Sequence, residues 1–290
     1  MEKNNTVNNK TSAFYAYTWY QIKWQLLRKR WYLPILLGLL LGIRAAMILQ
    51  GGPNVVVLKP ANAWDVLFSV FGNTFIIHLA IATAYLYLIG DLLPEPPYGQ
   101  LILFRLRSRR FWWGSKIITL FCLTLVFISL LTASIFLVGV LTHGWSTSYS
   151  ELAHQNWYIT GLPANLFKDG NPYINPAELF AQTIFLLFLA LFTSGLVVLI
   201  VDQLFSKSFW GLIAGFAFIF VSFIGNILSG PPSWVKWLPS QHFAYIGGMP
   251  IRTIPFLTSV LYWIVAIIIL VGLGYFRAIK QDIFSNSQEQ

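Results

Sequence analysis

Six apolar runs of about twenty residues divide this chain, and polar stretches separate them. In helical form, about twenty residues cover ~30 Å, which is the thickness of the hydrocarbon core of a bilayer. Because that core holds no water, the backbone groups of each run must bond to one another, and this favours helices. The chain is therefore predicted to be an all-α polytopic membrane protein. The predicted spans cover residues of about 31–50, 66–90, 116–141, 178–201, 209–229 and 256–276.

The composition agrees with lipid as the main solvent of the chain. Hydrophobic residues make up 57% and charged residues 10%, whereas soluble domains carry roughly 25% charged residues. The net charge of +9 does not indicate a nucleic-acid partner, because the basic residues stand at the ends of apolar runs, as topology determinants do. The single cysteine, Cys122, excludes an intrachain disulfide and a cysteine-based metal site.

The basic residues also predict the orientation of the chain. Six spans place both termini on one side, and fourteen of the 19 Lys and Arg residues fall on that side, against four in the opposite loops. The positive-inside rule then places both termini in the cytoplasm. We expect a multi-pass protein of a bacterial cell membrane, with one transmembrane domain over residues 14–276. A disordered cytoplasmic tail is predicted over residues 1–13, and a polar cytoplasmic tail over residues 277–290.

The first part of the domain, residues 14–30, mixes aromatic rings with basic side chains. Trp19, Ile22 and Leu26 fall at helical spacing, and the bases fall largely elsewhere. This pattern predicts an amphipathic helix that lies flat at the level of the lipid headgroups. The alternative is a plain juxtamembrane start to the first span.

No motif for catalysis or nucleotide binding stands out. The chain has no G-x-x-x-x-G-K-[ST] sequence, so it does not bind ATP through a P-loop. It has no His, Asp and Glu cluster at metal-ligand spacing and no Ser/His/Asp pattern. We therefore predict no catalytic residue, cofactor or metal in this chain. An intramembrane enzyme would need polar residues at matched depth in the spans, and none are evident.

Two basic side chains, Arg44 and His78, lie well inside predicted spans. Arg44 stands about four-fifths along the first span, where it either reaches the outer headgroups or pairs in the bundle, or else lines a path for an anionic substrate. His78 lies near the middle of the second span, where it either packs with a hydrogen bond or contacts cargo. Without further ionisable groups in the interior, active transport would depend on energy from a partner.

The segment between the second and third predicted spans, residues 91–116, is too polar for hydrocarbon. Prolines and a glycine near its start predict a sharp exit from the second span. We interpret it as a cytoplasmic connection folded as a short helix that docks on a partner. The alternative is that its basic residues only fix topology. These basic residues are Arg105, Arg107, Arg109, Arg110 and Lys116.

The order of residues in this segment is specific. Glu95 is followed four residues later by Gly99, and then by an apolar run, an Arg-Ser-Arg group and Lys116 at the start of the third span. This order resembles the first cytoplasmic loop of the permease subunits of ABC-2 type transporters. The resemblance assigns ATPase coupling to this segment. The resemblance carries over to Glu95, Gly99, Arg109 and Lys116, and the basic residues Arg105 and Arg107 are assigned to the coupling segment with them.

The resemblance also implies a fold and a function. It implies an N-terminal interface helix, a cytoplasmic coupling helix between spans two and three, and a re-entrant extracellular segment over residues 231–255. The chain would be the permease subunit of an ATP-driven exporter of a peptide, a lipid-linked molecule or a hydrophobic compound. ATP and Mg²⁺ would bind a separate cytoplasmic ATP-binding cassette protein, and a second permease subunit, identical or not, would complete the path. The alternative is a membrane anchor or sensor that recruits a cytoplasmic protein without transport.

Overall fold

The computed structural model describes most of the chain, and describes it as helices. The residues described are 2–51, 60–93, 109–155, 160–162, 164–167, 172, 174–205, 208–227, 237–243 and 254–280, with side chains from residue 13 onward except at residues 164, 165, 208, 222, 225–227 and 240. The α-helices are α1 (Glu2–Leu26), α2 (Leu33–Leu49), α3 (Ala63–Phe71), α4 (Thr83–Ile89), α6 (Arg109–His143), α7 (Glu151–Gln155), α9 (Pro176–Phe205), α10 (Ser208–Ile227) and α11 (Phe256–Lys280). Short 3-10 turns are η1 (Lys29–Tyr32), η3 (Ala164–Phe167) and η5 (Pro239–His242), and η2 (Ile76–Ala82) is a π-helix that leads into α4. None of these residues forms a strand.

Four helical segments are long and apolar enough to cross a membrane. They are η1 with α2, then α6, α9 and α11. The bent pair of α3 with η2 and α4 is a fifth candidate, and α10 contributes a shorter apolar stretch, Phe209–Val221. The chain is thus a polytopic helical membrane protein by the length and composition of its helices. A total of six spans stays a prediction.

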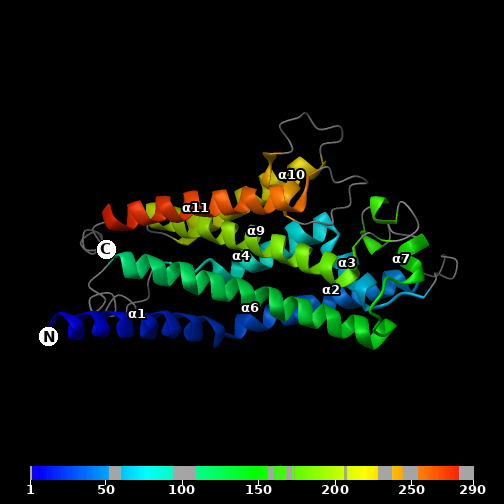
Figure 1. Cartoon of the computed structure of the whole chain (residues 1–290), viewed down its shortest axis with the longest axis horizontal. Helices are drawn as coiled ribbons and strands as arrows, with labels where there is room; N and C mark the ends of the chain where they lie inside the picture. The colour runs from blue at the N-terminus through cyan, green and yellow to red at the C-terminus, as the bar shows by residue number, and fades with distance from the viewer. Residues whose placement is uncertain are drawn as a thin grey trace.

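The long helix α6 lies between the other helices of the bundle. It packs against α1, α2, α3, α9 and α11, and Figure 1 shows it running along the length of the molecule. Its 35 residues extend ~52 Å, well beyond the ~30 Å of a hydrocarbon core. It therefore exceeds the predicted span, residues 116–141, at both ends.

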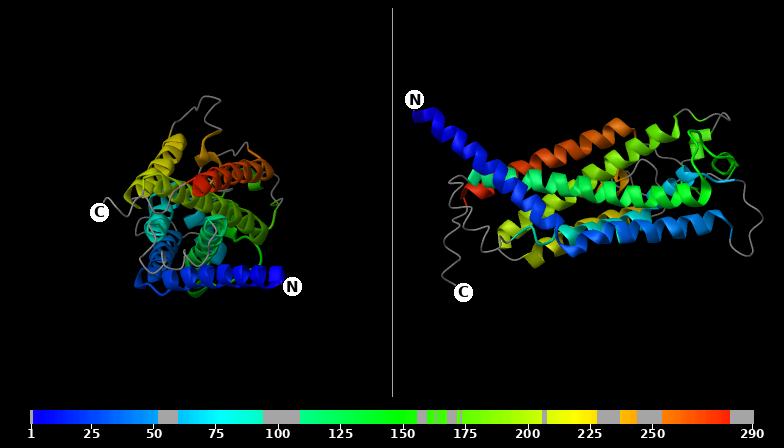
Figure 2. Two further views of the ribbon diagram at one scale, coloured as in Figure 1. Left: turned by 90° about the vertical axis from the view of Figure 1, so that its left-hand side faces the viewer. Right: turned by 90° about the horizontal axis from the view of Figure 1, so that it is seen from below.

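The molecule has two distinct ends. The start of α1, the start of α6 and the end of α11 lie at one end, which we call the terminal end (Figure 1). The start of α3 and all of α7 lie at the other, which we call the loop end. Figure 2 shows α1 crossing the terminal end at an angle to the bundle. Which side of a membrane the terminal end faces stays a prediction.

The first helix begins earlier than the sequence indicated. α1 starts at Glu2, whereas a disordered tail was predicted over residues 1–13 and a helix only from residue 14. No proline or glycine interrupts residues 2–26, so nothing in the local sequence stops the helix before the aromatic part begins.

The second predicted span, residues 66–90, is not one continuous helix. α3 ends at Phe71, and η2 with α4 continues at 87° to it. Asn73 starts the new direction, because its Oδ1 accepts a hydrogen bond from the backbone N–H of Ile76 at 3.2 Å and its carbonyl accepts one from Ile77 at 3.0 Å. An asparagine that caps a helix inside an apolar run is the local reason for the break.

The short helix α3 is buried on every side. A capping box holds its start: Asn62 Oδ1 accepts from the N–H of Trp64 at 2.9 Å, and Asp65 Oδ2 accepts from the N–H of Asn62 at 2.7 Å. The loop after α6 covers this end, since the carbonyls of Ser146 and Ser148 accept from the Trp64 indole and the Asn62 amide, both at 2.9 Å. Rings against α3 come from Trp145, Tyr149 and Phe180.

Two glycines bring α2 close to α6. A Cβ atom at Gly38 would stand 2.7 Å from Ser134 Cβ, and one at Gly42 would stand 3.0 Å from Val138 Cβ. Small residues four positions apart allow such close packing between membrane helices. This contact fixes the first span on α6.

Candidate functional site

The predicted coupling segment lies only partly within the described residues. Glu95, Gly99, Arg105 and Arg107 lie outside them, whereas Arg109 and Lys116 belong to the first turns of α6. The structure therefore describes the two ends of the connection, residues 91–93 and 109–116. We call these two stretches the connection base. The candidate site is built from what the connection base contacts.

Lys116 joins the two ends of the connection. It lies on α6 with 2% of its surface exposed, and its Nζ donates to the carbonyl of Leu92 at 2.8 Å. A buried ammonium is costly unless it is hydrogen-bonded. Because Leu92 follows α4 directly, this bond ties the end of α4 to the start of α6, whatever path the chain takes between them.

Asp91 joins the connection base to the junction of α1 and α2. Its carboxylate pairs with Arg28 and with Arg30, one guanidinium on each oxygen. Arg30 also donates to Gln25 Oε1 at 2.5 Å, and Arg28 lies over the ring of Trp24. Asp91 has 40% of its side chain exposed, so each pair contributes at most about 1 kcal/mol. The pairs mainly fix the position of the connection base relative to the junction of α1 and α2, since two planar guanidinium groups hold one carboxylate.

Arg109 joins the connection base to α11. Its Nη1 donates to the carbonyl of Ile279 at 2.8 Å, in the last turn of that helix. The last carbonyls of a helix have no partner within the helix, and a cation near them interacts favourably with the helix dipole. The start of α6 is thereby attached to the end of α11.

A polar contact fixes α1 to α6 beside the connection base. Thr18 Oγ1 donates to Ser115 Oγ at 3.0 Å, and Thr119 Oγ1 donates to Gln21 Oε1 at 3.1 Å. All four side chains are buried. The opposite face of α1 carries exposed rings, among them Trp19 at 67% exposure. The helix thus turns Thr18 and Gln21 toward α6 together with the buried ring of Tyr17, while other rings are exposed. Its position at a membrane interface stays a prediction.

The two residues predicted for a translocation path do not come together. Arg44 is exposed on α2, among exposed apolar side chains. His78 is buried in η2, where its Nδ1 lies 2.9 Å from the carbonyl of Thr74 and its ring lies 4.6 Å from that of Phe243. Phe243 follows η5, which packs against α9, α10 and α11. Most of the predicted re-entrant segment, residues 231–255, lies outside the described residues.

A further set of contacts between helices, at the start of α10, was not predicted from the sequence. Asp202 Oδ1 accepts from the backbone N–H of Gly211 at 2.9 Å, which closes the turn between α9 and α10. Gly90, at the end of α4, lies directly against the side chain of Leu212. The end of α4 therefore contacts α10 as well. An aspartate just before a short turn was the available signal for the first contact, and no pattern indicated the second.

No protein-family model matches this chain, and the searches of curated proteins and of solved structures found no match. Among the residues that the structure describes, no group of three or more His, Cys, Asp or Glu side chains is placed to hold a metal ion. The features that point to a function are therefore the connection base and the resemblance in the segment between its two ends.

Proposed function

We propose that this chain is the membrane subunit of an ATP-driven exporter of the ABC-2 type, moved by a separate cytoplasmic ATPase that binds the connection between α4 and α6. One observation carries the proposal. The bond from Lys116 to Leu92 holds the two stretches of the connection base together, and polar contacts attach the base to the junction of α1 and α2 through Asp91 and to α11 through Arg109. A segment that served only to link two spans would not need such attachments.

These attachments support the transmission of force. A partner that pushes on the connection would move α4 and α6 together, because Lys116 holds the carbonyl of Leu92. Asp91 would pull the junction of α1 and α2, and Arg109 would pull the end of α11. Rigid elements moved at one end by a partner are a general way to couple domain closure to a distant change.

The break in the second span would act as a hinge between a part that moves and a part that stays in place. α3 is held at the loop end by its capping box and by aromatic rings. α4 is held at the connection base instead, and the turn at Gly72 and Asn73 separates the two. In this mechanism, η2 and α4 tilt about the turn while α3 stays in place. His78, in η2, moves with them against Phe243.

The resemblance supplies the nature of the partner. Glu95 and Gly99, with the apolar run that follows, occupy the positions where an ABC-2 permease contacts its ATPase. Arg109 and Lys116 have a second role in this proposal, because they attach that segment to the helices. The cargo class follows from the resemblance alone: a peptide, a lipid-linked molecule or a hydrophobic compound.

Co-purification tests the binding half of the proposal. The chain is isolated from membranes that also contain a P-loop ATPase without spans of its own, encoded beside it. We expect the wild type to retain this ATPase, and the Glu95→Gln, Arg105→Gln double variant to lose it. Lys23→Gln, an exposed basic residue on α1, is the matched control and should retain it. A complex that survives the double change would contradict the assignment.

ATP hydrolysis in lipid vesicles tests the transmission half. The variants Asp91→Asn and Lys116→Met should still bind the ATPase, yet hydrolysis should lose its response to the membrane subunit. A membrane anchor without transport would bind the ATPase in the same way, but its hydrolysis rate would not depend on Asp91 or Lys116. That result would favour the anchor over the exporter.

A further inference from the structure

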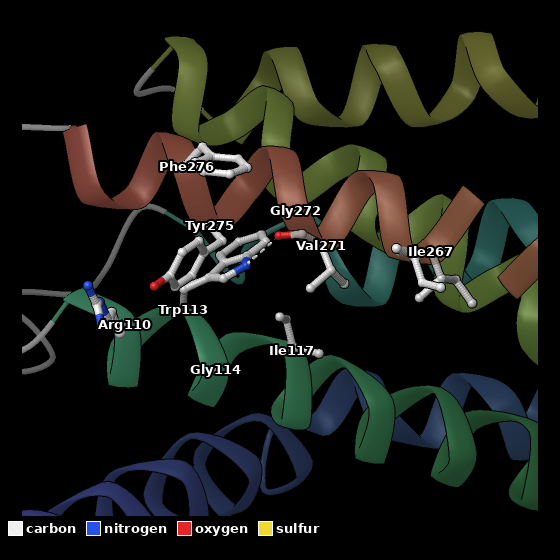
Figure 3. Close-up of a pocket in the computed structure, with 10 residues that line it drawn as sticks. Arg110, Trp113, Gly114, Ile117, Ile267, Val271, Gly272, Tyr275 and Phe276 are labelled. Atoms are coloured by element: carbon white, nitrogen blue, oxygen red, sulfur yellow. Dashed lines mark hydrogen bonds between the residues drawn. The ribbon is translucent and has the colours of Figure 1, made fainter. Parts of the chain in front are cut away.

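An open groove lies between the first turns of α6 and the last turns of α11 (Figure 3). Its volume is about 600 Å³, within the range of small-molecule sites. Trp113, which is buried, forms the floor and is fixed by a hydrogen bond from its Nε1 to the carbonyl of Val271 at 3.1 Å. Gly272 keeps the groove open, because a Cβ atom there would meet no heavy atom within 4 Å.

The walls of the groove are almost entirely apolar. Its length along α11, from Phe276 to Ile267, is roughly 13 Å at 1.5 Å per residue. Ile268 and Phe276 at its edge are both 65% exposed, so the groove opens sideways from the bundle. Both helices are candidates to cross a membrane, and an opening on the outward side of such helices would face the surrounding lipid.

One end of the groove is cationic. Arg110 stands there, exposed, with its guanidinium 5.9 Å from the centre of the Tyr275 ring (Figure 3). Arg277 and Lys280 are exposed at the same end of α11. None of the described residues that line the groove is acidic. The groove is therefore apolar along its length and positively charged where it reaches the terminal end of the molecule.

We propose that this groove binds one anionic phospholipid, with the phosphate at Arg110 and one acyl chain over Trp113 and Gly272. Charge decides the class of lipid, since a cation near an anionic membrane surface contributes about 1 kcal/mol. The apolar floor decides the position, because an acyl chain fills a trough that would otherwise lack contacts. The proposal does not depend on the ATPase, and it holds for the membrane chain alone.

Photolabelling of the purified full chain tests the proposal. The protein is placed in phosphatidylcholine vesicles that contain a minor fraction of phosphatidylglycerol with a diazirine in its acyl chain. After illumination, labelled peptides are located by mass spectrometry. We expect labels over residues 109–117 and 267–276, and much weaker labelling there from a phosphatidylcholine probe with the same diazirine.

Matched variants locate the site. Gly272→Leu should fill the groove and reduce labelling of both peptides to the phosphatidylcholine level, whereas Gly272→Ala should leave it unchanged. Arg110→Gln should reduce labelling about fivefold, the equivalent of about 1 kcal/mol. Arg277→Gln removes a cation at the same end that does not line the groove, and it should change labelling little. Thermal unfolding of each variant shows whether the fold is intact.

Three results would overturn the proposal. Equal labelling by both probes would mean that the groove does not select anionic lipid. Equal losses in Arg110→Gln and Arg277→Gln would mean that the charge of the whole end attracts lipid, without a defined site. Absence of groove labelling together with cross-links between two copies of the chain would mean that a second copy covers the groove.

Discussion

Gly72 and Gly161 meet backbone to backbone at the bend between α3 and η2. A Cβ atom on Gly72 would stand 2.5 Å from the carbonyl oxygen of Gly161, and Gly161 itself has a φ of +72°. The first glycine is required by space, and the second by space and by a backbone conformation that side chains disfavour. A contact of this kind holds the bend of one membrane segment against a loop 89 positions away in the sequence.

The Gly72→Ala variant should therefore be destabilised by about 1–3 kcal/mol, because the added methyl group meets backbone atoms that have no room to move. Thermal unfolding of the purified protein in detergent measures the loss. Gly272→Ala is the control, since its Cβ meets open space, and it should unfold at the wild-type temperature or slightly higher. Equal unfolding temperatures for both variants would show that the bend is looser than described.

Lys116→Met tests the bond between the two ends of the connection. Methionine keeps the unbranched apolar part of the side chain but lacks the ammonium group, so the carbonyl of Leu92 loses its donor at 2.8 Å. We expect a loss of about 1–3 kcal/mol in the free energy of unfolding, as for other buried groups left without a partner. Lys23→Met, on the exposed side of α1, should change stability by less than about 0.5 kcal/mol. A Lys116→Met protein as stable as Lys23→Met would contradict the bond.

The pairs between Asp91 and the two arginines should matter more for geometry than for stability. A double-mutant cycle with Arg28→Gln and Asp91→Asn should give a coupling energy of about 0.2–1 kcal/mol, because the carboxylate is partly exposed. The coupling should shrink as salt is raised, since mobile ions screen exposed charges. Unfolding measured at low and high ionic strength checks both points. Coupling that does not respond to salt would place the pair deeper than its exposure indicates.

The capping box of α3 can be compared with an exposed cap of the same residue type. Asn62→Ala removes bonds to Trp64 and to Ser148 at a buried helix start, and it should cost about 1–2 kcal/mol. Asn175→Ala removes one bond to the N–H of Glu178 at the exposed start of α9, and it should cost about 0.5 kcal/mol. Unfolding of the two variants under the same conditions gives the comparison. The reverse order would mean that α3 does not depend on its cap.

Much of the helical framework could be predicted from hydropathy. The predicted spans 178–201 and 256–276 correspond to Pro176–Phe205 and Phe256–Lys280, because long apolar runs have no other stable form in lipid. The break in the second span could not be predicted this way. Its local signal, Gly72 followed by Asn73, is short, and the glycine that completes it lies in a distant loop.

The candidate site was predictable in part, for a similar reason. Arg109 and Lys116 stood out as basic residues in a polar connection, and the structure describes both. Their partners are the backbone carbonyls of Ile279 and Leu92. Every residue has such a carbonyl, so no residue type in the sequence indicates these partners. Asp91 carried a signal as an acid facing a basic stretch, but the arginines that it contacts are more than sixty positions earlier.

The burial of α3 constrains how the protein is made. This helix has nine residues, too few to cross a bilayer, and it carries a carboxylate at Asp65. Its surroundings include Trp145, Gly161 and Phe180, which the ribosome adds much later. When residues 63–71 leave the insertion machinery, the residues that will bury them have not yet been synthesised. The second hydrophobic region therefore cannot reach its final packing until more than half of the polypeptide has been synthesised.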